Sequence, residues 1–175
     1  QTSRQTASGD VSFPDVQDVD TWLAMREAGV ANLRPAATKR VRWANGVSRT
    51  RYAVVFIHGF SASSEEIRPV PDRVANALGA NLHFARLAGH GRDGPAMAEP
   101  TCDDWLESTR EALSIGRVIG EEVIVISCST GGTLLCLALA KGDQTQIAAS
   151  IFVSPNFEVK RWDARIAMRA PGFRW

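Results

Sequence analysis

Runs of apolar residues alternate with amphipathic segments along most of the chain, and this alternation predicts its secondary structure. Residues 53–57 are apolar at every position, which is typical of a strand covered on both faces. Further buried strands are predicted over 81–87, 123–126 and 147–153. Helices are predicted between them over 69–78, 101–119 and 131–140. This order predicts an α/β fold with a mostly parallel sheet, right-handed crossovers and helices on both faces.

The N-terminal part predicts a short helix followed by a hairpin. Asp20 is expected to cap the helix and Gly29 to end it. The residues expected to share its inner side are Trp22, Leu23, Met25 and Ala28. Residues 38–44 then alternate in polarity, and Asn45-Gly46 is a strong turn signal because both turn positions need positive φ. We therefore expect an antiparallel hairpin between 38–44 and a strand over 47–57.

End signals define two of the later helices. Thr101 and Asp104 have the spacing of a capping box, and Gly120 is expected to close the helix that they begin. Gly79 is the expected stop of the helix over 69–78. The inward residues predicted for that helix are Val70, Val74, Ala77 and Leu78.

Composition fits one globular domain. Of 175 residues 45% are apolar, and the net charge is +1, so charge-driven disorder is excluded and nucleic-acid binding is not suggested. The longest strictly apolar runs, 53–57 and 134–140, are much shorter than the roughly 20 residues of a membrane span. The first residue is Gln and no signal-like segment follows, so we expect a trimmed N-terminus. We expect a tail and short helix over 1–36, an α/β core over 37–156, and the start of a cap or lid over 157–175.

The segment 123–132 carries the clearest candidate chemistry. It places Ser129 on a tight turn between a buried strand and a helix of small residues. Such a turn strains the backbone of the serine, so the residues two positions away must be small, and here they are Ser127 and Gly131. The helix that starts at Thr130 offers amide donors to a developing oxyanion. An ordinary serine-rich turn is the alternative interpretation.

A second feature follows the central strand. Residues 56–60 read Phe-Ile-His-Gly-Phe, and serines at 61, 63 and 64 precede the next helix. An oxyanion hole built at such a serine requires a second amide donor, and this loop is where it would come from. Together the two features are much more specific than either alone.

With these motifs in this order, residues 37–155 resemble the α/β-hydrolase fold family, most closely its bacterial esterases, lipases and carboxylesterase-like members. The loop over 87–94, Leu-Ala-Gly-His-Gly-Arg-Asp-Gly, is part of the resemblance. The resemblance implies that Ser129 is the nucleophile, and that the backbone amides of Phe60 and Thr130 form the oxyanion hole. The chain departs from the usual G-x-S-x-G pattern at Ser127.

The same resemblance implies supporting roles for His58, Gly59 and Gly131. His58 would hold the loop and would not act as the catalytic base. In this fold the acid and the histidine follow the nucleophile, whereas all three histidines of the chain, His58, His83 and His90, precede Ser129. Glu158 and Asp163 are conceivable acids, and neither is assigned.

We therefore expect the chain to be the N-terminal portion of a hydrolase, truncated before the last strands and nearly inactive alone. The catalytic Asp and His would lie outside it. Residues 160–175, with Trp162 and Ile166 one helical turn apart, resemble the beginning of a cap. The edge of the strand over 147–153 would be open, to be covered by a missing C-terminal segment or by self-association.

Other patterns in the chain predict no site. Residues 89–94 match G-x-G-x-x-G, but Pro95 and Pro100 break the helix that a dinucleotide site needs. Cys128 is expected to be a buried structural residue, and the three cysteines have no disulfide or metal-site spacing. Six basic residues without an acid are expected to form the solvated outer face of the hairpin: Arg34, Lys39, Arg40, Arg42, Arg49 and Arg51.

The sequence thus predicts a serine hydrolase of carboxylic esters that acts on a small-molecule acyl ester through an acyl-enzyme on Ser129. We expect no metal or organic cofactor, no nucleic-acid partner and no membrane span. An amide or peptide hydrolase of the same fold is the alternative enzyme. A non-catalytic binding protein of this fold is favoured by Ser127 and the absent histidine, whereas the intact segment 129–132 and His58-Gly59 favour an enzyme.

Overall fold

The structure, a computed structural model, describes residues 13–143 and 145–157. Within them one sheet has the strand order β1-β3-β2-β4-β5. The strands are β1 (Arg40–Arg42), β2 (Thr50–Ile57), β3 (Asn81–Phe84), β4 (Gly120–Cys128) and β5 (Ile147–Val153). β2 to β5 run parallel, and β1 is antiparallel to β3. The predicted α/β class with a mostly parallel sheet is confirmed.

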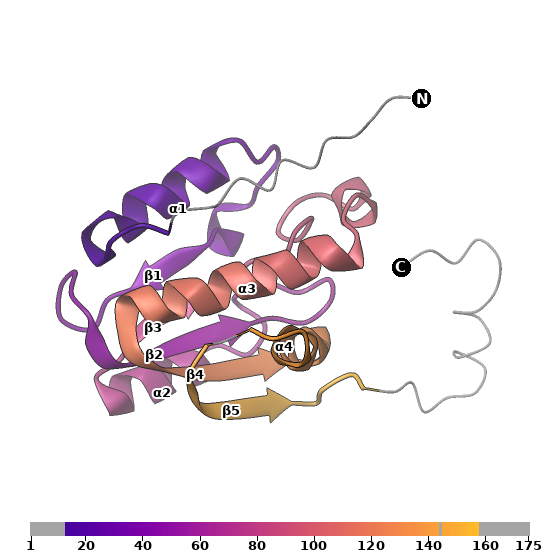
Figure 1. Cartoon of the computed structure of the whole chain (residues 1–175). Helices are drawn as coiled ribbons and strands as arrows, with labels where there is room; N and C mark the ends of the chain where they lie inside the picture. Colours follow the sequence, from indigo (N-terminus) through magenta and orange to yellow (C-terminus); the bar gives the residue numbers. More distant parts are fainter. Residues whose placement is uncertain (1–12, 144, 158–175) are drawn as a thin grey trace.

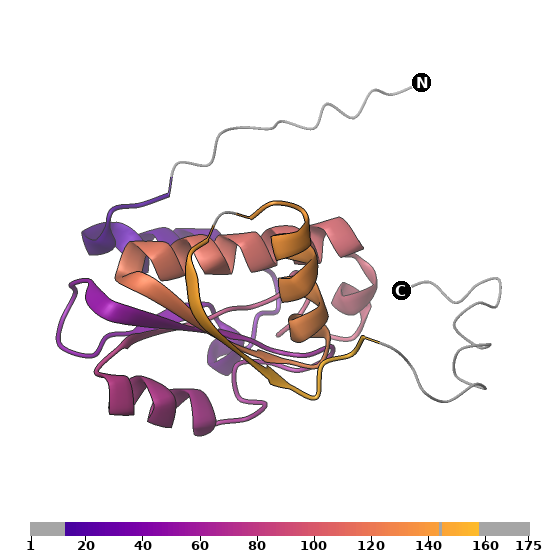
Figure 2. The same ribbon diagram turned by 60° about the horizontal axis from the view of Figure 1, so that its bottom comes forward.

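Helices cover both faces of this sheet (Figures 1 and 2). α1 (Val19–Ala28), α3 (Cys102–Ile119) and α4 (Thr130–Ala140) lie on one face, and α2 (Val70–Leu78) lies on the other. Short 3-10 helices are η1 (Val16–Asp18), η2 (Pro35–Ala37) and η3 (Pro95–Ala98). In the described part of the chain, no helix has both the length and the apolar character needed to cross a bilayer.

The side chains of β2 alternate between two cores. Val55 and Ile57 pack into the cluster that contains residues of α3 and α4. Val54 and Phe56 pack into the cluster on the α2 side, which includes Ala75. Successive side chains of a strand point to opposite faces, so a strand with a core on each side must be apolar throughout. This explains the unbroken apolar run over 53–57.

The predicted ends of α3 and the predicted stop of α2 are confirmed. Thr101 and Asp104 form a capping box at the start of α3, and Gly120 follows its last residue. Gly79 ends α2 with φ of +59°, a left-handed conformation that glycine adopts without strain.

The predicted hairpin is wrong, because β3 lies between β1 and β2. β1 therefore pairs with a strand that comes after β2 in the chain. Asn81, the first residue of β3, ties down the connecting loop: its side chain accepts from the backbone N–H of Ala44 at 3.0 Å and donates to the carbonyl of Ser48 at 2.7 Å. Gly46 has the positive φ expected of a turn residue. The loop that contains it does not join two paired strands, but passes the N-terminal end of β3 on its way from β1 to β2. Turn chemistry predicts a reversal of direction, and it does not identify the strand that is paired.

α1 buries only part of the predicted face, since Leu23 is inward but Ala28 is exposed. Val19, Leu23 and Glu27 are buried, whereas Met25 is 65% exposed. Glu27 faces inward because its carboxylate binds the guanidinium of buried Arg86 at 2.6 Å. Burial alone would raise the pKa of Glu27, but the hydrogen bond and charge of Arg86 lower it overall. A pattern of apolar residues could not reveal an inward-facing ion pair.

Two smaller expectations about helices are also wrong. Asp20 does not cap α1, whose N-cap is Asp18, and instead accepts a hydrogen bond from the indole N–H of Trp43 at 2.8 Å. In α2 three of the residues predicted to face inward, Val70, Ala77 and Leu78, are exposed. The residues of α2 that are buried are Pro71, Asp72 and Ala75.

The basic residues over 29–64 form a solvated face only in part, because Arg34, Arg49 and Arg51 are exposed whereas Lys39, Arg40 and Arg42 are half-buried. Several bind acids or carbonyls of distant elements: Lys39 with Glu111, Arg40 with Glu65, Arg42 with Asp72, and Arg49 with the carbonyl of Gly120. They fasten the N-terminal segment to the rest of the fold. The positive charges of Lys39, Arg40 and Arg42 are therefore balanced by acids of other elements.

Candidate active site

The carboxyl ends of β2 and β4 adjoin at the point where the chain changes direction across the sheet. From β2 the chain goes to β3 on one side and later returns to β4 on the other. Loops diverge at such a point, which is where open α/β sheets bind their ligands. His58 and Gly59 follow β2, and Ser129 follows β4. The fold therefore brings both sequence motifs to this switch point.

Ser129 has an unusual backbone conformation, with φ of 46° and ψ of −116°. A positive φ is costly for a residue with a side chain and persists only where the surroundings enforce it. The N–H of Ser129 donates to the carbonyl of Val153 at 2.9 Å, and its carbonyl accepts from Gly132 at 3.0 Å and from Asn156 at 3.2 Å. The strained turn is thus held between α4 and the end of β5.

Two glycines bring the loops after β2 and β4 into contact. A Cβ added to Gly131 would lie 2.5 Å from the carbonyl oxygen of Ile57 and 2.6 Å from that of His58. A Cβ added to Gly59 would lie 3.1 Å from the Cβ of Ser129. A larger residue at 131 would force α4 away from β2, so its small size is a requirement of the packing.

Ser127 fits the position where the family pattern has glycine. It is completely buried, and its hydroxyl makes a long hydrogen bond of 3.4 Å to the carbonyl of Ile151 in the neighbouring strand. A Cβ added to Gly132 would lie 3.5 Å from the Ser127 oxygen, which is ordinary contact. The extra hydroxymethyl group is therefore accommodated between β4, β5 and the first turn of α4.

His58 is buried beneath the loop that it precedes. Its Nε2 accepts the backbone N–H of Leu87 at 3.1 Å, and its Nδ1 lies 2.8 Å from the carbonyl oxygen of Gly59. This arrangement requires a neutral ring that carries its proton on Nδ1. Burial lowers the pKa of His58 to about 4. With both nitrogens engaged, the ring links the loop after β2 to the loop after β3.

His90 holds the same loop from the other side, a role that could not be predicted from the motifs in the sequence. Its Nε2 accepts the backbone N–H of Ser61 at 3.1 Å, and its Nδ1 lies 3.0 Å from the carbonyl oxygen of Ala88. The rings of His58 and His90 are 4.9 Å apart. The glycines on both sides of this histidine, at 89 and 91, were the available signal, because they mark a tight turn that aims its side chain.

Glu66 is a second residue that sequence reasoning missed. Its Oε2 accepts the backbone N–H of Gly59 at 2.8 Å, and its Oε1 would lie 3.0 Å from a Cβ at position 59. A carboxylate therefore stands beside the contact between Gly59 and Ser129. Nothing local distinguishes Glu66 from its neighbour Glu65, since only the fold of the loop over 59–69 brings one of them back to its start.

Cys128 is buried, as predicted. Burial first, and then the charge and hydrogen bond of Glu66, raise the pKa of this thiol to about 11. The thiol is therefore protonated at neutral pH, which makes it a poor nucleophile.

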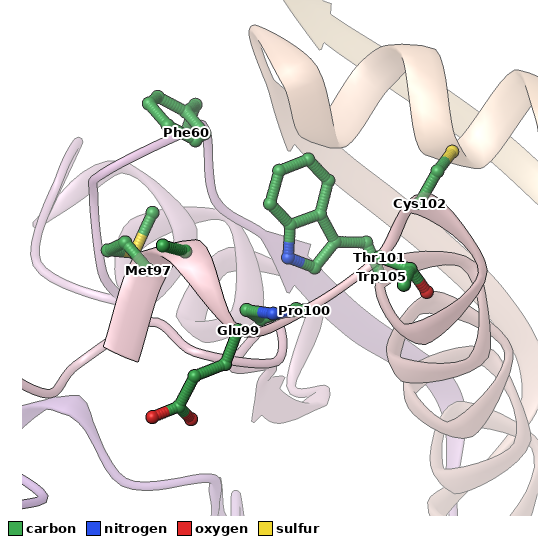
Figure 3. A pocket seen from close by; sticks show the side chains of 8 residues that line it. Phe60, Met97, Glu99, Pro100, Thr101, Cys102 and Trp105 are labelled. Carbon is green, nitrogen blue, oxygen red and sulfur yellow. The ribbon is translucent and has the colours of Figure 1, made fainter. Parts of the chain in front are cut away.

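A pocket of about 480 Å³ opens beside Phe60 (Figure 3). The described residues that line it are Phe60, Met97, Ala98, Glu99, Pro100, Thr101, Cys102 and Trp105. The rings of Phe60 and Trp105 meet edge to face at 5.9 Å. Ser129 is not among these lining residues, and Phe60 is the lining residue that directly follows Gly59, the neighbour of Ser129.

The glycine pattern over 89–94 contributes to the packing of the pocket wall. Gly89 has φ of +74°, and a Cβ there would lie 2.5 Å from both the carbonyl oxygen of Ala96 and the side chain of Pro100. The segment that follows forms the 3-10 helix η3, in agreement with the expectation that the prolines prevent an α-helix. Gly89 thus allows the pocket wall to pack directly on the turn that carries His90.

Some predicted features lie outside the described residues, namely Glu158, Asp163, Trp162 and Ile166. Over 13–143 and 145–157, no group of three or more His, Cys, Asp or Glu side chains is arranged to hold a metal ion.

Comparisons with known proteins identify a family and a fold. Residues 54–175 match the model of the family described as "Alpha/beta hydrolase family". A solved structure reported with LipS and LipT, two metagenome-derived lipolytic enzymes, has a TM-score of 0.67 and 22% identity, covering 80% of this chain and 54% of that chain. Est1E from Butyrivibrio proteoclasticus, solved with ferulic acid bound, has a TM-score of 0.52 and 22% identity, covering 65% of this chain and 46% of that chain.

A Pyrobaculum calidifontis esterase has a TM-score of 0.51 and 19% identity, covering 91% of this chain and 60% of that chain. The chain therefore spans only about half the length of the solved structures that it matches. No curated protein sequence matches it. At these identities the likeness to solved structures concerns the fold.

Proposed function

The chain belongs to the alpha/beta hydrolase family, and on that premise we propose that the complete protein is a serine hydrolase of carboxylic esters with Ser129 as its nucleophile. The hydroxyl oxygen of Ser129 attacks the acyl carbonyl, and its proton passes to a histidine that lies outside this sequence. The alcohol leaves with that proton, and water then hydrolyses the acyl-enzyme to release the acid.

The observation that supports this proposal most is the strained backbone of Ser129 at the switch point, directly beside Gly59. A serine held in this way presents its side chain at the end of the sheet. Thr130 is the first residue of α4, and the first N–H groups of a helix have no partner within the helix. In the proposal its amide and that of Phe60 bind the oxyanion.

Supporting roles follow from the contacts already described. His58 and His90 fix the loop over 59–61 through its backbone, and Glu66 binds the N–H of Gly59. Gly131 lets this loop and α4 approach one another. The predicted cap over 157–175 and the catalytic acid and histidine stay predictions, and the exposed edge strand β5 is where we place a further segment that would bring them.

A fluorophosphonate probe tests the nucleophile directly. We expect one adduct on the complete protein, mapped to Ser129 by mass spectrometry, and none on the Ser129→Ala variant. Hydrolysis of p-nitrophenyl butyrate by that variant should fall by about 10³-fold or more. Ser150→Ala, which changes an exposed serine of β5, should keep both the adduct and the rate. A complete protein whose ester hydrolysis survives Ser129→Ala would contradict the proposal.

An amide or peptide hydrolase of the same fold would use the same residues. Matched acyl p-nitrophenyl esters and p-nitroanilides separate the two activities, and we expect the esters to be hydrolysed faster. A non-catalytic binding protein would give no adduct at Ser129.

A further inference from the structure

We infer that the pocket beside Phe60 is an apolar subsite that receives a medium-length, uncharged hydrocarbon group of the ester. This inference rests on the proposed function, because it assigns a substrate group to the space next to the proposed reaction centre. The group is the acyl chain or the alcohol chain, and both have the same chemistry.

Continuity between the pocket and Ser129 is the first argument. A Cβ added to Gly59 would lie 3.1 Å from the Cβ of Ser129, and the next residue, Phe60, lines the pocket and is 38% exposed. A carbonyl held at the backbone of Phe60 is therefore only one side chain away from the pocket. One substituent of that carbonyl has a direct path along the Phe60 ring.

The lining is the second argument, because its polar groups already have partners. The indole N–H of Trp105 donates to the carbonyl of Ala88 at 3.0 Å, and the hydroxyl of Thr101 donates to Asp104 at 2.7 Å. Glu99 binds Arg92 at 2.8 Å, and in Figure 3 its carboxylate points away from the Phe60 ring.

None of the described lining residues is Lys, Arg or His. A carboxylate or phosphate would therefore find no cation among these lining residues to bind it. A hydrocarbon group would instead contact the rings and side chains of Phe60, Met97, Pro100 and Trp105. A volume of about 480 Å³ lies within the usual range of small-molecule sites.

The wall is also fixed before any ligand arrives. His90 packs against the rings of Trp105 at 5.8 Å and Phe60 at 5.9 Å. Gly89 lets η3 sit directly on the same turn. A preformed apolar wall binds a hydrocarbon group with little further loss of side-chain conformational entropy.

Cys102 provides a readout that does not depend on activity. It is an exposed free thiol in the lining, whereas Cys136 lies outside the pocket and is half-buried. We would measure the alkylation rate of each thiol by N-ethylmaleimide, with and without 2-decanone, an uncharged ketone with a hydrocarbon chain. We expect 2-decanone to slow alkylation of Cys102 by about fivefold or more, and to leave Cys136 unchanged. Acetone should protect neither thiol, and decanoate should protect Cys102 less than 2-decanone.

The Ser129→Ala variant separates this inference from the proposed function. Its pocket is unaltered, so Cys102 should be protected as in the wild type. Lack of protection in both proteins, or equal protection of Cys102 and Cys136, would overturn the subsite even if Ser129 proves to be the nucleophile. Protection that persists while ester hydrolysis proves independent of Ser129 would overturn the proposed function and leave an apolar binding site.

Filling the pocket tests its part in selecting substrates. Ala98 is exposed and lines the pocket, so Ala98→Trp occupies the space without disturbing the core. We expect the ratio of kcat/KM for p-nitrophenyl octanoate to that for p-nitrophenyl acetate to fall about tenfold. Octyl acetate against ethyl acetate gives the same comparison for the alcohol chain, and the ratio that falls identifies the group bound. Ala140→Trp, the same change on the exposed end of α4, should alter neither ratio, and two unchanged ratios in Ala98→Trp would overturn the inference.

Discussion

The backbone N–H of Gly59 donates to the carboxylate of Glu66 across 2.8 Å, so the loop after β2 is closed by a bond between its first residues and its far end. His90 holds Ser61 in the same loop at 3.1 Å. The backbone of Phe60 is thus fixed on both sides, immediately next to Ser129. The direction of the Phe60 amide is set by two side chains that need not touch the substrate.

Glu66 is therefore expected to be a positioning residue. Glu66→Ala removes the acceptor of the Gly59 N–H, and kcat for ester hydrolysis by the complete protein should fall by about tenfold, with little change in KM, since small displacements of catalytic groups are costly. Glu66→Gln keeps an acceptor oxygen and should restore most of kcat. Glu65→Gln, which changes the neighbouring carboxylate, is the control. Equal losses in the Ala and Gln variants would show that charge, not the hydrogen bond, is what matters.

Gly131→Ala should damage stability and the site together. The new Cβ would meet the carbonyl oxygens of Ile57 and His58 at 2.5 and 2.6 Å, and overpacking of this kind costs about 1–3 kcal/mol. α4 must then shift, so labelling of Ser129 by a fluorophosphonate should become slower. Gly94→Ala is the matched control, because nothing lies within 4 Å of its added Cβ. Similar urea midpoints for the two variants would contradict the close approach.

Stability should fall as the pH falls from 6.5 toward 4. Burial lowers the pKa of His58 and of His83 to about 4, from 6.5, and that of His90 is lowered as well. Above pH 6.5 these rings are neutral in the folded and in the unfolded protein. Below pH 6.5 the histidines of the unfolded chain become protonated, whereas the buried rings of the folded chain stay neutral. In that window His58 and His83 each lower the free energy of unfolding by about 1.4 kcal/mol per pH unit.

Urea midpoints at about pH 7.5, 6 and 5 measure this dependence. His83→Leu removes one of the buried rings and should make the slope shallower. A midpoint that does not change between pH 7.5 and 5 would mean that the histidines are not held neutral. Carboxyl groups with lowered pKa, such as Glu27, act at lower pH, because their ordinary value is 4.5.

Loss of one partner of the ion pair between Glu27 and Arg86 should lower the free energy of unfolding more than loss of one partner of a surface ion pair. Both side chains are less than a tenth exposed, so Glu27→Ala leaves a buried unpaired guanidinium and should cost about 3–5 kcal/mol. The double variant Glu27→Met with Arg86→Met should recover much of that loss. A single variant as stable as the wild type would show that α1 contributes little to the fold.

Much of the fold could be predicted because its signals are local. The capping box at Thr101, the stop at Gly79 and the apolar run over 53–57 each act within a few residues. The partner of β1 could not be predicted, because it depends on which strand the rest of the sheet leaves unpaired. The inward face of α1 depends on Arg86, which lies far along the chain and carries a charge that hydropathy assigns to the surface.

The candidate site divides in the same way. Ser129, Gly131 and His58-Gly59 carry recognisable patterns, since a strained turn and a close approach restrict residue size. Glu66, His90 and the pocket residues were missed because their roles come from loops that meet only in three dimensions. Met97 and Trp105 look like ordinary core residues in the sequence, and only the folded structure shows that they border an open space.

The strand order also decides when each edge is covered during synthesis. Both strands on one side of β2, β1 and β3, leave the ribosome before β4, which covers the other side. A nascent chain can therefore assemble the half-sheet β1-β3-β2 with α2, while the free edge of β2 waits through the synthesis of η3 and α3. The unpaired backbone groups of that edge can bind strands of other chains and so cause aggregation. The edge of β2 therefore lacks a paired strand from the emergence of residue 84 until residue 128 follows. Ser129 emerges only when that edge can be covered by β4.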